Sequence, residues 1–407
     1  MERAHIAGLS AVVLDKSAFL YQHSFGYEEI ETRNPITNSS IFLLASISKT
    51  VIAVAAMRLV ERNQLDLDKD INTYLARANV TEIHHPLYPM DKITMRHLLT
   101  HTSSINTNEE MVFGFYLPED NYLNRTIREL VSDYLVPGGS LYHPINWINK
   151  TIGTQFHYSN MATSLAALII EVIVNTSYDD YVRENIFHPL DVYDARFALG
   201  DQRKNLVHHY AYNSSLASWE LYLPQLHVQE IPNTYWLQIG FFSFREWPAG
   251  LLRMSSTSLA KYLQMFLNDG TSLSGVKILD SHSVEVIRTI QYQNLVAPIS
   301  VGLLWNYANI SSSIFHKNRT VFGHRGSALG TLTSMLIDPT TNIGTILLTN
   351  ADRDANEYEG QLVQQFMSDV TLHLLDCFSS PSNVATNIYS YNLLFLLLTF
   401  IQRYSVM

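Results

Sequence analysis

The chain has 407 residues, 47% of them hydrophobic, and a formal net charge of −10 at pH 7. This size allows a large buried core, in two domains or in one domain with an insertion. The acidic balance, without any Lys/Arg-rich run, argues against nucleic acid and anionic membrane surfaces as partners. Cys377 is the only cysteine and no His-Glu-x-x-His string occurs, so we expect no internal disulfide, no metal and no cofactor.

Two short β-prone runs begin the chain. Residues 6–14 and 19–24 flank a polar turn, which predicts a β-hairpin. The first run also has the outline of a short signal peptide, but Glu2 lies in the segment that should be basic. We therefore predict a strand, with a cleavable signal as the alternative.

The run 50–60 is apolar on nearly every side, which predicts a buried helix too short to span a bilayer. Ser46 and Lys49, at its start, are three positions apart and lie on one face of a helix. A serine becomes a nucleophile when a base removes its proton, and a desolvated lysine can be that base. A helix N-terminus also favours a developing oxyanion. Such a string is common by chance and needs partners elsewhere.

Helices with recognisable N-caps are predicted in the middle of the chain. Residues 93–103 predict a short helix capped by Thr94. An apolar helix is expected at 161–174, and Ser177 caps another that runs to Ile186.

The segments 104–150 and 202–245 lack a clear period and are predicted to be irregular. A helix is expected from Ser258 to about 269. The last third then predicts two antiparallel strands, 331–337 and 344–349, and a final helix at about 357–375.

Two other places could complete a serine site. Tyr158 and Asn160 stand at a loop–helix junction, where a phenol and an amide can face a cleft. His324 and Gly326 lie at the edge of a predicted strand, where glycine lets a substrate approach the backbone as an added strand would. Alone, each is more typical of a packing or structural residue. Their order and spacing relative to Ser46 favour a shared catalytic site.

The chain resembles the serine β-lactamase-like hydrolases: class C β-lactamases, DD-peptidases, and related esterases and D-aminopeptidases. The three motifs look like S-x-x-K at Ser46 and Lys49, Y-x-N at Tyr158 and Asn160, and the K-T-G or H-x-G box at His324 and Gly326. Shorter matching strings are Ala7-Gly8-Leu9-Ser10, Ser24-Phe25-Gly26-Tyr27, Leu98-Leu99-Thr100-His101-Thr102-Ser103, Pro248-Ala249-Gly250 and Leu348-Thr349-Asn350. The resemblance runs from about residue 5 to 377.

The resemblance implies an α/β fold of the α+β type. An antiparallel β-sheet flanked by helices would be built from both ends of the chain, with a mostly helical subdomain inserted and the active site in the cleft. We expect 1–75 and 246–377 to form the α/β part, 76–245 the insertion, and 378–407 a tail outside the core.

In the family the serine is acylated, and water or another acceptor then releases the acyl group. The resemblance implies that Ser46 is the nucleophile, Lys49 its base, and Tyr158 a proton relay to the leaving group. Asn160 would orient Lys49 and the substrate. The backbone N–H groups of Ser46 and Ser327 would form the oxyanion hole. The substrate would be a small molecule or a peptide.

Three positions depart from the family pattern. Arg325 stands where a small or hydroxyl residue is usual, and it can pair with a substrate carboxylate or fill the cleft. Ser104 and Leu251 each replace a glycine. These departures favour an esterase- or peptidase-like hydrolase over a true β-lactamase. The alternative is a non-catalytic binding or scaffolding protein on the same fold, because fold does not fix function.

N-x-[ST] acceptors, if used, imply surface loops in a secretory-pathway or extracellular protein. They occur at Asn38, Asn79, Asn124, Asn149, Asn175, Asn213, Asn309 and Asn318.

The tail combines a small-residue linker at 379–383, a polar spacer and an apolar run at 393–401. This order resembles a lipid-anchor attachment signal, although polar residues end the chain. The run is too short to span a bilayer. The alternatives are an extra helix packed on the domain, or disorder. Membrane contact is expected only through this tail.

Overall fold

A computed structural model describes residues 4–200, 203–292, 300–312, 314–352 and 357–379. Its centre is an eight-stranded sheet in the order β11-β12-β13-β14-β15-β1-β2-β3, with every neighbouring pair antiparallel. The strands are β1 (Gly8–Leu14), β2 (Phe19–Glu29), β3 (Asn34–Pro35), β11 (Ser300–Val301), β12 (Asn306–Ser312), β13 (Lys317–Ala328), β14 (Thr331–Asp338) and β15 (Ile343–Thr349). The predicted sheet built from both chain ends is confirmed.

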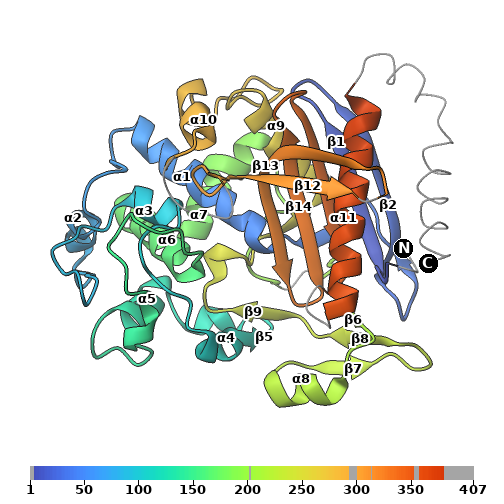
Figure 1. The fold of residues 1–407 in the computed structure, drawn as a ribbon, viewed down its shortest axis with the longest axis horizontal. Helices are drawn as coiled ribbons and strands as arrows, with labels where there is room; N and C mark the ends of the chain where they lie inside the picture. The colour runs from blue at the N-terminus through green and yellow to red at the C-terminus, as the bar shows by residue number, and fades with distance from the viewer. Residues whose placement is uncertain (1–3, 201–202, 293–299, 313, 353–356, 380–407) are drawn as a thin grey trace.

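The sheet separates two hydrophobic cores. Side chains of a strand alternate between faces, so Val12 and Leu14 of β1 join the core that includes α9 (Ser256–Leu267), whereas Val13 packs under α11 (Glu357–Phe378). Figure 1 shows α11 lying across one face of the sheet. All seven residues of β1 are buried, as expected for a strand covered on both faces.

The helical part is organised around α6 (Asn160–Val174). Its apolar residues contact α1 (Ser48–Glu61), α2 (Asn72–Leu75), α3 (Met95–Leu99), α5 (Ile127–Leu135) and α7 (Tyr178–Val182). The predicted N-caps at Thr94 and Ser177 are confirmed, because their hydroxyls accept from the backbone N–H of His97 and Asp180.

Several other elements are short. They include β4 (Ile41–Leu43), β5 (Tyr116–Pro118), β9 (Phe242–Phe244), β10 (Arg253–Ser255), α4 (Glu109–Phe115), α10 (Ser281–Arg288) and the 3₁₀ turns η1 (Ala45–Ile47) and η7 (Trp247–Ala249). β4 pairs with β10, and β5 pairs with β9.

The two segments predicted to be irregular contain regular structure. In the first, α5 begins at a capping box in which Thr126 and Glu129 satisfy each other's backbone N–H groups. In the second, β6 (His209–Tyr212), β8 (Trp236–Ile239) and β7 (Val228–Glu230) form a three-stranded sheet, and α8 (Leu216–Tyr222) lies between them in sequence. The prediction was wrong here because strands this short show no readable period, and pairing between distant segments forms them.

Within the described part of the chain, no single helix is long and apolar enough to cross a membrane; α6 and the helix ending at Leu190 pass the test only as a pair bent by 78°. The anchor-like segment of the tail lies outside the described residues. The asparagines of all eight N-x-[ST] acceptors are exposed.

Candidate active site

Ser46 sits where β4 turns into the helical part. The chain leaves the strand at Leu43 and makes the 3₁₀ turn η1, with Ala45 in the left-handed region at φ 48°. Ser46 therefore precedes the α-helix, which begins two residues before the predicted start, at Ser48. The Ser48 hydroxyl donates to the Ala45 carbonyl at 2.6 Å and accepts from the Leu252 N–H at 3.2 Å. These bonds fix the turn that leaves Ser46 partly exposed.

Lys49 lies behind the serine and is fully buried. Its Nζ is 3.0 Å from Ser46 Oγ and donates to the Ala249 carbonyl at 2.7 Å. Burial lowers the pKa of Lys49 to about 7, against a smaller opposing effect of Glu246. An amine with this pKa is largely neutral at slightly alkaline pH, so it can accept the serine proton.

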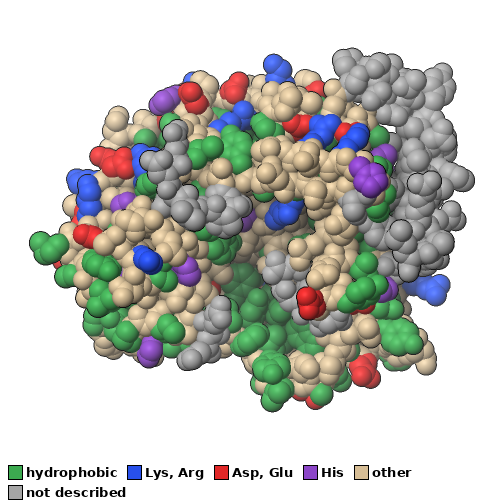
Figure 2. Space-filling view, in the orientation of Figure 1, with side chains coloured by type: hydrophobic (Ala, Val, Ile, Leu, Met, Phe, Trp, Pro, Cys, Tyr) green, Lys and Arg blue, Asp and Glu red, His purple; other side chains and the backbone are tan. Residues whose placement is uncertain are grey.

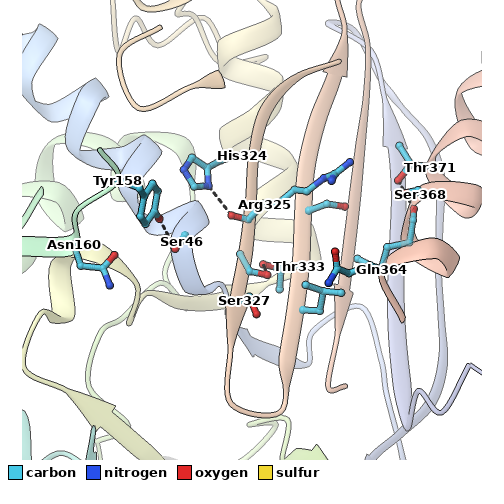
Figure 3. A pocket seen from close by; sticks show the side chains of 14 residues that line it. Ser46, Tyr158, Asn160, His324, Arg325, Ser327, Thr333, Gln364, Ser368 and Thr371 are labelled. Carbon is cyan, nitrogen blue, oxygen red and sulfur yellow. Dashed lines mark hydrogen bonds between the residues drawn. The ribbon is translucent and has the colours of Figure 1, made fainter. Parts of the chain in front are cut away.

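Tyr158 approaches the same serine from the loop before α6. Its hydroxyl donates to Ser46 Oγ at 2.8 Å, and Lys49 Nζ lies 4.9 Å from the centre of its ring (Figure 3). The ring packs on His101, with 4.4 Å between centroids. Burial raises the pKa of the Tyr158 hydroxyl, although a hydrogen bond with Ser46 opposes this. The tyrosine is therefore protonated at neutral pH.

Asn160 is the first residue of α6, and its side chain hydrogen-bonds Glu246. Among the described residues its amide makes no hydrogen bond to Lys49, the group that the resemblance gives it to orient. Glu246 is 3% exposed, and burial raises the pKa of its carboxyl to about 7, against the opposing effect of Lys49. Lys49 and Glu246 thus form a buried pair of opposite sign that titrates near neutrality.

The third motif, at His324 and Gly326, lies on a stretch of β13 that does not pair with β12. β12 pairs with β13 only as far as Gly323, whereas β14 pairs with β13 up to Ala328. At Gly326, a Cβ would lie 2.3 Å from the Leu44 carbonyl oxygen and 2.9 Å from Ala45 Cβ. The missing side chain is what lets β13 pack this close to the turn that carries Ser46.

His324 points from β13 toward the serine side of the cleft (Figure 3). Its Nδ1–H donates to the Arg325 carbonyl at 2.6 Å, which leaves Nε2 as an acceptor. Nε2 is buried without a hydrogen-bond partner in the described structure. Burial lowers the pKa of His324 to about 3, so this position supplies a neutral hydrogen-bond acceptor rather than a cation.

A cavity of about 390 Å³ joins the three motifs and continues toward α11. Figure 2 shows this face of the molecule hollowed between the helical part and the sheet. The cavity brings together Ser46, Tyr158, Asn160, His324, Arg325, Gly326 and Ser327. A second, small cavity of about 60 Å³ lies beside Ser46. Its lining includes the polar residues Asn160, Glu246 and Ser327 as well as apolar residues such as Val112, Phe115 and Phe244. Its size and these polar residues suit a water molecule.

Sequence reasoning missed Glu246 and His101 as members of the site. Glu246 follows an arginine and directly precedes Trp-Pro-Ala-Gly, the one local signal that could have found it. His101 lies in a string that was noted only for its resemblance. Burial lowers the pKa of His101 far below its usual range, and its Nδ1 accepts the Ser159 N–H at 3.2 Å. Its role is to support the loop that carries Tyr158.

The described residues contain no group of three or more His, Cys, Asp or Glu side chains that could hold a metal ion. The site chemistry available from these residues is proton transfer and nucleophilic attack.

Comparison with known proteins gives a consistent picture. The family model described as Beta-lactamase matches residues 1–366. Penicillin-binding protein 4* of Bacillus subtilis (strain 168) is 30% identical over 195 residues, which are 47% of this chain and 38% of that protein. This chain covers less than two thirds of the length of the first curated relatives that it matches.

Solved structures are similar over nearly the whole chain. D-amino acid amidase from Ochrobactrum anthropi SV3 with L-phenylalanine is 18% identical, with 91% of this chain and 95% of that chain covered and a TM-score of 0.69. EstCE1, described as a hydrolase with promiscuous acyltransferase activity, is 17% identical, with coverage of 90% and 94% and a TM-score of 0.61. At these identities the likeness concerns the fold, and it confirms the expected fold class.

Proposed function

The chain belongs to the β-lactamase family, and from this premise we propose that it is a serine hydrolase acting through an acyl-enzyme on an ester or amide. One observation carries the proposal: Ser46 Oγ lies 3.0 Å from Lys49 Nζ and 2.8 Å from the Tyr158 hydroxyl. A nucleophile in contact with a base of pKa about 7 and with a phenolic proton donor is what acyl transfer requires.

In the acylation step, neutral Lys49 takes the Ser46 proton while Oγ bonds to the substrate carbonyl carbon. The backbone N–H groups of Ser46 and Ser327 stabilise the resulting oxyanion. The bond to the leaving alcohol or amine then breaks, and Tyr158 donates the proton that this group needs. The proton on Lys49 restores the phenol, so the amine is again neutral.

In the deacylation step, water attacks the acyl carbonyl and loses a proton to Lys49. The bond from Ser46 Oγ to the acyl carbon breaks, and the serine recovers its proton from Tyr158. Lys49 then passes the proton that it took from water to the phenolate, which restores neutral lysine and protonated tyrosine. Occupation of the small cavity beside Ser46 by this water is part of the proposal, and the lining residues Asn160, Glu246 and Ser327 support it.

The larger cavity suits a small molecule or a short peptide, since typical ligand sites occupy about 300–1,000 Å³. The names of relatives, an amidase and a hydrolase with acyltransferase activity, support an ester or amide substrate. The exposed N-x-[ST] acceptors support a glycosylated secretory-pathway protein as part of the same proposal.

Labelling with an activated fluorophosphonate tests the proposal, with Ser46→Ala as the matched control. We expect one label per chain in the native protein and none in the variant. A folded native protein that is not labelled, and that hydrolyses no ester, would favour the non-catalytic binding or scaffolding alternative. A penicillin used as a second probe tests whether a cyclic amide also acylates Ser46.

A further inference from the structure

Arg325 leaves β13 on the opposite face from its neighbour. Because strand side chains alternate, His324 faces the serine and Arg325 faces α11. Figure 3 shows the Arg325 side chain extending away from Ser46, toward the side of the cleft where Gln364 and Ser368 lie. It thus stands apart from the reacting atoms while it still lines the same cavity.

Two cavities meet at this arginine. The cavity of about 390 Å³ reaches it from Ser46, and another of about 560 Å³ continues between β12 and α11. Arg325, Gln364 and Ser368 line both cavities. The two cavities therefore adjoin at Arg325.

The Arg325 side chain is exposed, and its guanidinium has no hydrogen-bond or ion-pair partner among the described residues. Of the described residues that line the two cavities, none is Asp or Glu, and Arg325 is the only Lys or Arg. His324 adds no charge, because burial keeps its pKa at about 3. The walls around Arg325 thus offer one fixed positive charge.

A buried hydroxyl on the neighbouring strand adds a second unused group. Ser334 pairs with Arg325 in the register of β13 and β14, is 3% exposed and lines the larger site cavity. Its Oγ has no hydrogen-bond partner in the described structure. Buried polar groups are normally paired, so an unpaired hydroxyl in a cavity wall is available to a water molecule or a ligand atom.

We propose that Arg325, with Ser334, Gln364 and Ser368, forms an anion subsite that binds a carboxylate carried by the substrate at a distance from the scissile ester or amide bond. The guanidinium fork matches a carboxylate bidentately. The hydroxyls and the amide supply further donors. This inference rests on the proposed hydrolase function and names its substrate class: elongated, with one anionic end.

Matched ester pairs test the proposal. One pair places the charge on the acyl half: the mono-p-nitrophenyl esters of adipic to sebacic acid against their ω-methyl esters. The other places it on the leaving group: 4-acetoxybenzoate against its methyl ester. The readout is the ratio of kcat/KM for the acid to kcat/KM for the neutral partner.

In at least one pair, Arg325→Ala should lower this ratio by about 10- to 100-fold, the range for hydrogen bonds to a charged group. Arg325→Lys should lower it less, since charge remains but the fork is lost. Lys317→Ala is the control: it removes a cation from the same strand, paired with Asp376 and outside both cavities, and should leave the ratio unchanged.

Binding separates the subsite from the chemistry. In the Ser46→Ala background, calorimetry with monomethyl suberate should show a Kd about 10-fold or more weaker when Arg325 is also replaced by alanine. We expect this weaker binding whether or not the protein hydrolyses esters. Absence of ester hydrolysis would overturn the proposed hydrolase function but not the subsite. An unchanged ratio in both ester pairs, together with an unchanged Kd, would overturn the subsite.

Discussion

Tyr158 donates a hydrogen bond of 2.8 Å to Ser46 Oγ across 112 positions of sequence. Lys49 Nζ lies 3.0 Å from the same oxygen. The serine oxygen therefore touches one group able to take a proton and another able to give one. In the proposed mechanism, proton transfer in both acylation and deacylation then needs no rearrangement of the backbone.

Replacing Tyr158 by phenylalanine removes the donor and keeps the ring that packs on His101. We expect kcat for an ester to fall about 10²- to 10⁴-fold, the range for general acid–base groups. The melting temperature should change little, because only one partly exposed hydroxyl is lost. An unchanged kcat in a folded variant would remove Tyr158 from the mechanism.

The pKa of Lys49 sets the pH dependence. Burial lowers this pKa to about 7, and only the neutral amine accepts the serine proton. Therefore kcat/KM for a neutral ester should rise about tenfold per pH unit below 7 and level off above it. His324 is expected to add no limb between pH 5 and 9, because burial lowers its pKa to about 3. Burial also lowers the pKa of His101 well below its usual value. A flat profile down to pH 5 would contradict Lys49 as the base.

Glu246 tunes that profile through its charge. It opposes the burial that lowers the pKa of Lys49, so Glu246→Gln should lower that pKa further and move the acid limb to lower pH by roughly one unit. The amide keeps an acceptor for Asn160. Glu82→Gln, at an exposed position, is the control and should leave the limb in place. Loss of the limb in Glu246→Gln would instead mean that Glu246 is the titrating group.

The proximity of the proposed nucleophile and base could be predicted from sequence because their relationship is local. Three positions of spacing bring Ser46 and Lys49 together on almost any helical turn, and the observed 3₁₀-to-α junction still gives 3.0 Å. Tyr158 and His324 required the family resemblance, since only the fold brings them to the serine. Glu246 was missed because two consecutive charged residues, Arg245 and Glu246, are typical of a surface. In the fold η7 packs against α6 and Glu246 is buried.

Whether a helix or strand could be predicted also depended on whether its sequence signal is local. Thr126 and Glu129 carry a capping box that does predict α5, yet the surrounding Asn-, Tyr- and Pro-rich composition hid it. β8 is different, because its four residues are strand only through pairing with β6 and β7 on either side. Such pairings depend on residues far apart in sequence, and no short window contains them.

Glycosylation is testable at the exposed acceptors. If the protein is made in a eukaryotic secretory pathway, treatment with peptide-N-glycosidase F should lower its mass, and single Asn→Gln variants should each remove one glycan at occupied sites. Asn309 is the most informative acceptor, because it lines the cavity of about 560 Å³ beside Arg325. A mass unaffected by the glycosidase would contradict the glycoprotein proposal.

A substitution at Gly326 tests how closely β13 must approach η1, the turn that carries Ser46. In Gly326→Ala, the new Cβ would meet the Leu44 carbonyl oxygen at 2.3 Å and Thr333 Oγ1 at 2.4 Å. Backbone atoms cannot rotate away, so β13 must move outward from η1. We expect a stability loss of about 1–3 kcal/mol, the usual cost of overpacking, and a lower kcat/KM, since Ser327 moves with the strand.

Gly114→Ala is the matched control for this substitution. Gly114 lies near the end of α4, where a Cβ would meet nothing within 4 Å, and alanine is the better helix former. This variant should keep kcat/KM and melt at the same or a slightly higher temperature. If Gly326→Ala behaves like Gly114→Ala in both assays, the free edge of β13 does not set the oxyanion geometry, and the proposed role of the Ser327 N–H fails.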